Sequence, residues 1–210
     1  MQNLYKIGGA IAAVAVGVFA ASGFQEAATK FGVVDITKVV EQSEFGKTNQ
    51  TTFNTMKKAR EGVLEFIDTY RVLTVEQANK IKDLSIKPNI TAGEKAELES
   101  AKAEVIAASK KNQELSTKQN LTPEDRALIE EYSKRANNME MTANRWLREF
   151  TTELQQWADQ QKVASLDKAR GAVNEVAKAQ GFTLVFEVGV APYGANDLTD
   201  AALKAMNAKK

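Results

Sequence analysis

The sequence predicts a mostly α-helical protein with a small β body, from which a long antiparallel coiled-coil hairpin projects as an arm. Three observations predict this fold. Alanine, lysine, glutamate, glutamine and leucine dominate the middle of the chain, as they do in long helices. Only three prolines and twelve glycines interrupt the 210 residues. Short β-type runs lie near the two ends of the chain.

The first residues have the order of a secretory signal peptide. A short head carries one positive charge at Lys6, an apolar run covers Ile7–Ala20, and small residues follow up to Gly23. The run is too short for a comfortable membrane span, which needs about 20 apolar residues. We therefore expect residues 1–23 to be a signal peptide, cleaved between about residues 20 and 28, and the protein to be exported. An uncleaved membrane anchor is the alternative.

Two short elements come next. Phe31–Asp35 is a β-type run, and Ile36–Ser43 predicts a short helix that ends near Phe45–Gly46. From Lys47 onward, apolar residues recur at alternating steps of three and four, with Arg60 in one position of the series. That spacing places one apolar stripe along a helix, as in the seam of a coiled coil.

Helices are predicted at residues 47–72, 75–86, 92–117 and 123–179. Three of their starts share a pattern in which a threonine follows an apolar residue and precedes an acid by two or three positions: Leu73-Thr74-Val75-Glu76, Ile90-Thr91-Ala92-Gly93-Glu94 and Leu121-Thr122-Pro123-Glu124. Threonine accepts a hydrogen bond from an exposed N–H at a helix start, and acids in the first turn suit the helix dipole. Pro88 predicts a turn between the second helix and the third.

The last of these helices is the longest. Its apolar residues keep the three- and four-residue spacing: Ile129, Tyr132, Ala136, Met139, Ala143, Trp146, Phe150, Leu154, Trp157 and Ala164. A helix over 123–179 would be roughly 85 Å long and would need partners along this stripe. The earlier helices, which return antiparallel through the Pro88 turn, are the natural ones. Gly181 occupies the position of a C-cap glycine and ends the helix.

Short elements close the chain. Thr183–Val188 predicts a strand, Val190–Tyr193 a second strand, and Leu198–Met206 a closing helix that Asp197 or Thr199 caps. Strands at the two ends of a chain can share one sheet only if the helical middle goes out and comes back.

The expected domains follow from this return. Residues 30–46 and 181–207 are expected to form one oligomerisation body. Residues 47–180 are expected to form the helical hairpin arm.

Composition excludes several classes of function. The chain has no cysteine and no histidine, which removes thiol nucleophiles, imidazole bases and Cys/His zinc sites. Its 28 basic and 27 acidic residues are nearly balanced, whereas a nucleic-acid surface needs a basic surplus. The carboxylates of Glu130, Glu131 and Glu175 have no matched partner or metal-ligand spacing. We therefore expect no enzyme, no cofactor, no metal and no nucleic-acid partner.

The end segments carry a recognisable order of motifs. Phe31-Gly32-Val33-Val34-Asp35 follows the signal peptide, and Ala177–Phe186 continues through Val190–Tyr193 to Asp197–Leu203. This order of glycine-terminated helix, hydrophobic strand, tyrosine-containing turn, Asp-Leu-Thr cap and closing helix is similar to that of the Skp/OmpH family of periplasmic chaperones. The likeness covers residues 31–50 and 165–207, and across the middle it is architectural.

The resemblance implies a periplasmic homotrimer. Strands and short helices of three subunits would form a central body, and the arms would hang around a cavity. Unfolded outer-membrane proteins would be held there without ATP, and transient contact with a membrane surface is a further expectation. The middle of this chain is longer than expected of the family, and its charge is near neutral where familiar members are strongly basic.

Candidate interaction residues come from the strands and the helical stripe. For the oligomer interface we expect the apolar strand residues Val33, Val34, Leu184, Phe186, Val188, Val190 and Tyr193. For client binding we expect large or adaptable side chains of the helices, namely Met56, Met139, Trp146 and Trp157. The alternative for this stripe is a packing seam between helices.

Two other functions remain open. The coiled coil would serve as a structural spacer or scaffold of the cell envelope if it bound a folded partner and had no affinity for unfolded chains. It would bind lipopolysaccharide or a membrane surface if its basic pairs, Lys110-Lys111, Lys134-Arg135 and Lys209-Lys210, clustered in space.

Overall fold

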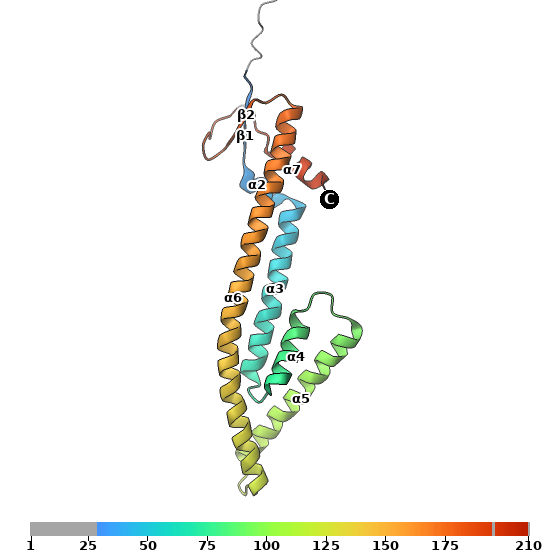
Figure 1. Cartoon of the computed structure of the whole chain (residues 1–210), viewed down its shortest axis with the longest axis vertical. Coiled ribbons are helices and arrows are strands. Elements are labelled where there is room, and N and C mark those ends of the chain that lie inside the picture. Colours follow the sequence, from blue (N-terminus) through green and yellow to red (C-terminus); the bar gives the residue numbers. More distant parts are fainter. Residues whose placement is uncertain (1–28, 195, 210) are drawn as a thin grey trace, which may run out of the picture. The chain divides into compact units, whose positions relative to one another are not determined.

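The computed structural model of the chain describes residues 29–194 and 196–209 (Figure 1). The predicted signal peptide lies outside these residues. The described residues divide into two compact units, one made of residues 29–41 with 168–194 and 196–209, and the other of residues 42–167. We call them the sheet unit and the helical unit. Mostly helical structure with a small sheet confirms the predicted fold class.

The sheet unit contains two parallel strands from opposite ends of the chain. Strand β1 (Phe31–Val34) pairs with β2 (Leu184–Glu187), and the register places Phe31 opposite Leu184 and Val33 opposite Phe186. This pairing confirms that the helical middle leaves the sheet and returns to it.

A third segment lies along the other edge of β1. The N–H of Val33 donates to the carbonyl of Asn196 at 2.8 Å, and the N–H of Leu198 donates to the carbonyl of Val33 at 2.8 Å. The second strand predicted at Val190–Tyr193 is wrong, since these residues form a turn and an irregular loop. The N–H groups of Val190 and Ala191 instead turn back to the carbonyl of Glu187.

Helices close the core of the sheet unit. These are α2 (Ile36–Gln42), α7 (Thr199–Ala208) and the last part of α6 (Pro123–Ala179). The buried apolar residues of the unit are Val33, Val34, Val39, Ala169, Ala172, Val173, Val176, Leu198, Ala202 and Met206. Residues from two segments that are far apart in the sequence therefore form this core.

Helix α3 (Glu44–Thr69) begins earlier than its sequence predicts. The expected break near Phe45–Gly46 is wrong because Ser43 caps the helix there: its hydroxyl oxygen accepts the N–H of Gly46 at 2.9 Å. Glycine is therefore accommodated in the first turn of α3. The helix also ends three residues before the predicted limit.

The helical unit contains more passes than a simple hairpin. Helices α3 and α6 run antiparallel, as the contacts Asn49 with Ser165 and Arg60 with Glu153 show. Between them in the chain lie α4 (Val75–Ile86) and α5 (Ala92–Thr117), whose bounds match the prediction. Helix α4 packs on α3, and α5 packs back on α4 (Figure 1). The additional length of the middle is therefore a second helical hairpin.

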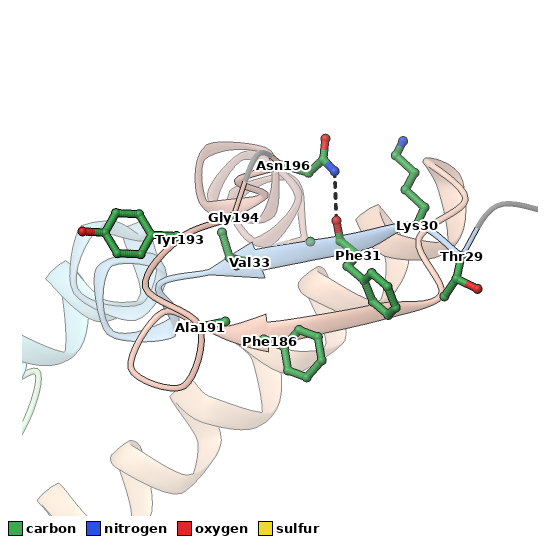
Figure 2. Close-up of a pocket in the computed structure, with 10 residues that line it drawn as sticks. Thr29, Lys30, Phe31, Val33, Phe186, Ala191, Tyr193, Gly194 and Asn196 are labelled. Atoms are coloured by element: carbon green, nitrogen blue, oxygen red, sulfur yellow. Dashed lines mark hydrogen bonds between the residues drawn. The ribbon is translucent and has the colours of Figure 1, made fainter.

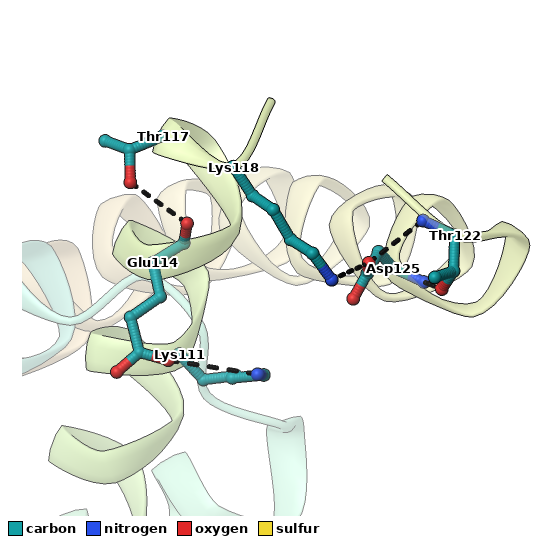
Figure 3. A network of polar contacts seen from close by, with 6 residues as sticks. All are labelled: Lys111, Glu114, Thr117, Lys118, Thr122 and Asp125. Atoms are coloured by element: carbon teal, nitrogen blue, oxygen red, sulfur yellow. Dashed lines mark hydrogen bonds and ion pairs between the residues drawn. The ribbon is translucent and has the colours of Figure 1, made fainter. Parts of the chain in front are cut away.

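Threonines start three of these helices, as predicted. Thr74 and Thr91 form reciprocal capping boxes with Gln77 and Glu94. At the start of α6 the capping acid is Asp125 rather than Glu124, because Asp125 occupies the third helical position. Its carboxylate accepts the N–H of Thr122 at 3.0 Å and pairs with Lys118 (Figure 3).

One apolar cluster joins all four helices of this unit. Its buried members are Val63, Ile67, Val72, Leu73, Ala78, Ile81, Leu98, Ala101, Val105, Leu115, Tyr132, Met139, Trp146 and Phe150. Toward the start of α3 the seam continues through Phe53, whose ring centre lies 6.1 Å from that of Trp157.

Candidate functional site

The sheet unit exposes an apolar face that its own helices do not cover. Because paired residues of parallel strands point to the same side, Phe31, Leu184 and Phe186 share one face of the sheet. Their exposed fractions are 49%, 51% and 38%. The rings of Phe31 and Phe186 lie 6.2 Å apart and sit side by side on this face (Figure 2). We call the surface that these three side chains form the sheet face.

The loop after β2 extends the apolar surface. Val190 is 75% exposed and Tyr193 is 96% exposed. The same loop covers Val33, since Gly194 lies so close that an added Cβ would be 2.4 Å from Cγ1 of Val33. A shallow depression of about 650 Å³ lies between this loop and β1, with Phe31, Phe186 and Tyr193 among its lining residues (Figure 2).

The predicted interface residues divide into two groups. Leu184, Phe186, Val190 and Tyr193 are exposed. Val188 is half-buried, and its N–H donates to the carbonyl of Val34 at 3.0 Å. Val33 and Val34, at 7% and 2% exposure, belong to the core of the chain itself. Four of the seven side chains are therefore accessible, and Phe186 and Tyr193 line the same depression.

Strand β2 is an edge strand in the part of the chain that the structure describes. Strand β1 has neighbours on both sides, namely β2 and the segment at Asn196–Leu198, whereas the two-stranded sheet ends at β2. An edge strand offers backbone N–H and C=O groups to a further chain. Here that edge adjoins exposed apolar side chains.

The predicted interface set omitted two residues of this surface. Phe31 lies on the sheet face, and Asn196 holds the carbonyl of Phe31 through a side-chain bond of 2.9 Å (Figure 2). Alternation along β1 could have found Phe31, because it shares a face with Val33. Nothing in the local sequence marks Asn196, whose partner lies 165 positions away.

Polar contacts fix the sheet unit from within. The Glu187 carboxylate accepts the N–H of Ile36 at 3.2 Å, and the ammonium of Lys30 lies 4.1 Å from the centre of the Phe182 ring. Hydrogen bonds from the Thr199 side chain and backbone lower the pKa of the Asp197 carboxyl from its ordinary value. These contacts hold the chain segments of the sheet unit together.

The predicted client-binding residues lie in the helical unit. Met139 and Trp146 are each 1% exposed and belong to its core cluster. Met56 and Trp157 are half-buried along α3 and α6. Met139 and Trp146 are thus packed between helices of the chain, while Met56 and Trp157 keep part of their surface in water.

Arg60 is the polar member of this seam. Its guanidinium donates to the Glu153 carboxylate at 3.0 and 3.2 Å and to the carbonyl of Met56 at 3.2 Å. It also lies 5.5 Å from the centre of the Phe150 ring. The Arg60 guanidinium therefore has two hydrogen-bond acceptors and an aromatic ring as neighbours.

Among residues 29–194 and 196–209, no group of acidic side chains could hold a metal ion. Within the same residues, no helix is long and apolar enough to cross a membrane.

Comparison with known proteins gives one match. Residues 67–206 match the family model described as outer membrane protein (OmpH-like). The matched range contains α4, α5, α6 and β2, and it includes the C-terminal motifs from Ala177 to Leu203; Phe31–Asp35 lies before it. No curated protein and no solved structure matches the chain.

Proposed function

Because the chain belongs to the OmpH-like family of outer membrane proteins, we propose that it is an ATP-independent chaperone that holds unfolded outer-membrane proteins. The observation that carries the proposal is the family match, which spans residues 67–206. The exposed apolar residues Phe31, Leu184 and Phe186 of the described structure also support a binding role. Its place of action would be the periplasm, reached through the signal peptide expected at residues 1–23.

The working form would be a homotrimer built on the sheet unit. Phe31, Leu184 and Phe186 leave an apolar face in water, and Tyr193 stands almost fully exposed beside it. Burying such a surface against another copy is favourable in proportion to the apolar area removed from water. The open edge of β2 would add main-chain hydrogen bonds to the same contact.

Clients would be bound by many weak apolar contacts. Without ATP, a client can be released only if each of its contacts is weak. Many such contacts together hold the client while it keeps some motion. Met56 and Trp157 are half-exposed on α3 and α6, and methionine repacks easily around different partners. These two residues are the accessible part of the expected client surface.

An aggregation assay tests the proposal. A urea-unfolded β-barrel protein of an outer membrane is diluted into buffer with increasing amounts of the protein without residues 1–23, and light scattering is followed. Suppression near one trimer per client is expected. Unchanged scattering at several-fold excess would refute the chaperone function.

A structural spacer is the second candidate. The observation in its favour is the burial of Met139 and Trp146, which leaves the seam of the helical unit closed. A spacer would bind a folded partner and show no affinity for unfolded chains. Light scattering that gives a dimeric rod rather than a trimer, together with no suppression of aggregation, would favour it.

A further inference from the structure

Helix α4 occupies the surface on which clients are expected to bind. The ammonium of Lys82 on α4 lies 5.1 Å from the centre of the Trp146 ring on α6. Ala78 and Ile81 are the buried residues of α4, and both belong to the cluster that contains Met139 and Trp146. The large apolar side chains of α6 are therefore in contact with a helix of the same chain.

The α4–α5 hairpin is bonded to α6 where the chain enters the hairpin and where it leaves it. At its entry, the guanidinium of Arg135 donates to the carbonyl of Val72 at 3.1 Å. At its exit, Lys118 of the α5–α6 turn pairs with Asp125 on α6 (Figure 3). These bonds hold the entry and the exit of the hairpin, whereas the turn at 87–91 lies at its opposite end.

The hairpin is also joined within itself. Lys80 on α4 pairs with Glu97 on α5 at 3.3 Å, and Lys87 pairs with Glu94 across the connecting turn. Because these ion pairs link α4 to α5 and not to α6, they are kept when the two helices move together. A displacement of α4 from α6 that keeps these pairs must therefore carry α5 with it.

Helix α5 is held by a narrow apolar stripe. Along its 26 residues the buried positions are Leu98, Ala101, Val105 and Leu115. Leu98, Ala101 and Val105 follow the i, i+3, i+7 spacing of one face and lie against α4. This stripe and the two ion pairs join α5 to α4, so the two helices form one hairpin.

We infer that the α4–α5 hairpin is a displaceable cover over the apolar face that α3 and α6 form. We call this face the covered face, and its buried residues are Val63, Ile67, Met139, Trp146 and Phe150. An apolar segment of an unfolded client takes the place of α4 on it. The inference rests on the proposed function, because it names the surface and the competitor for the same client.

A cover of this kind has two physical consequences. It keeps a large apolar surface out of water when no client is present, which limits self-association. It also weakens client binding, because the apparent affinity equals the intrinsic affinity multiplied by the fraction of molecules in which the cover is open. Loosening the cover must then strengthen client binding, and fastening it must weaken binding.

A tether tests the fastening. Since the natural chain has no cysteine, paired cysteines can be introduced without interference. In Lys82→Cys with Arg145→Cys, a bis-maleimide joins α4 to α6 beside Trp146. In the matched control, Lys80→Cys with Glu97→Cys, the same reagent joins α4 to α5, where an ion pair of 3.3 Å already lies.

Each tethered protein is compared with its own untethered form for holding a urea-unfolded outer-membrane β-barrel protein. The 82–145 tether is expected to weaken client binding about five-fold or more, and the 80–97 tether to leave it unchanged. Equal binding with and without the 82–145 tether would overturn the inference. If even the natural chain holds no client, the proposed function fails instead.

Two substitutions test the loosening. Ile81→Ala removes the buried contact of α4, and Lys82→Gln removes the charge over Trp146 without making a cavity. Each is expected to tighten client binding, by about five-fold for Ile81→Ala. Lys80→Ala is the control: Lys80 precedes Ile81 on α4 but pairs with Glu97 on α5, so this variant should bind as the natural chain does. Weaker or unchanged binding by folded Lys82→Gln and Ile81→Ala would overturn the inference.

Discussion

The hydroxyl oxygen of Thr199 accepts a hydrogen bond from the backbone N–H of Asp35 at 2.9 Å, across 164 positions of sequence. Thr199 is 2% exposed, and its own N–H donates to the Asp197 carboxylate at 2.8 Å. One side chain therefore connects the end of β1 to the start of α7. The contact joins the two terminal segments of the sheet unit.

Thr199→Val should lower the free energy of unfolding by about 1–3 kcal/mol. Valine keeps the shape of threonine but leaves the Asp35 N–H without its acceptor in a largely buried place. Urea denaturation measures the change. Thr199→Ser restores an acceptor and should recover most of the loss, so equal stability of the valine and serine variants would contradict the role of the hydroxyl.

Gly194→Ala should destabilise the sheet unit by about 1–3 kcal/mol. Its Cβ would lie 2.4 Å from Cγ1 and 2.8 Å from Cγ2 of Val33, a buried branched side chain with little room to rotate. Thermal unfolding gives the effect. Gly189→Ala in the same loop is the control, because no heavy atom lies within 4 Å of the added carbon there.

Arg60→Leu should change the free energy of unfolding by less than about 1 kcal/mol. The Glu153 side chain that remains is 50% exposed, so water replaces the lost partner, and leucine continues the apolar seam. The reverse change, Glu153→Gln, should cost more, because it leaves the Arg60 side chain at 11% exposure without its counter-charge. Denaturant titration of both variants ranks them, and the opposite order would show that Arg60 is needed for the pairing of α3 with α6.

The contacts of the Glu94 carboxylate in the turn between α4 and α5 should be lost at a lower pH than the contacts of a carboxylate with an ordinary pKa. The Lys87 side chain, followed by the N–H and hydroxyl of Thr91, lowers the pKa of Glu94 from 4.5 to about 2. A lowered folded-state pKa contributes stability above pH 4.5, and that stability is lost as the pH falls toward about 2. Carboxyl NMR measures the titration directly.

Lys87→Gln should raise the Glu94 pKa, because it removes the largest cause of the shift. Lys95→Gln removes an equal charge beside Glu94 without touching that hydrogen bond. A Glu94 titration that the Lys87 change leaves where it was would assign the shift to the Thr91 cap alone.

Local patterns in the sequence were sufficient for the helices. The limits of α4, α5 and α6 could be predicted because each begins with a side-chain cap, and capping depends on residues within three positions. The same logic failed at Gly46, where glycine suggested a break. Ser43 outweighs that tendency by supplying an acceptor to the first turn of α3.

The features that could not be predicted depend on contacts between residues that are far apart in the sequence. Val190–Tyr193 has a strand-like composition, but strand structure needs a neighbour with open backbone groups, and the chain turns back on Glu187 instead. For Met139 and Trp146, periodicity alone could not separate a seam from a client surface. The position of α4 buries both residues, and no local pattern of α6 contains that information.

The pairing of β1 with residues near the other end of the chain has a consequence for folding kinetics. The pairs Lys80–Glu97 and Lys87–Glu94 are close in sequence, whereas the Asn196–Phe31 bond spans 165 positions. Rates fall as contact order rises, so the helices should form early and the sheet last. When the chain emerges with its N-terminus first, Phe31–Val34 stays unpaired until residues 184–198 have also emerged. For that interval the protein itself carries an exposed, aggregation-prone β segment.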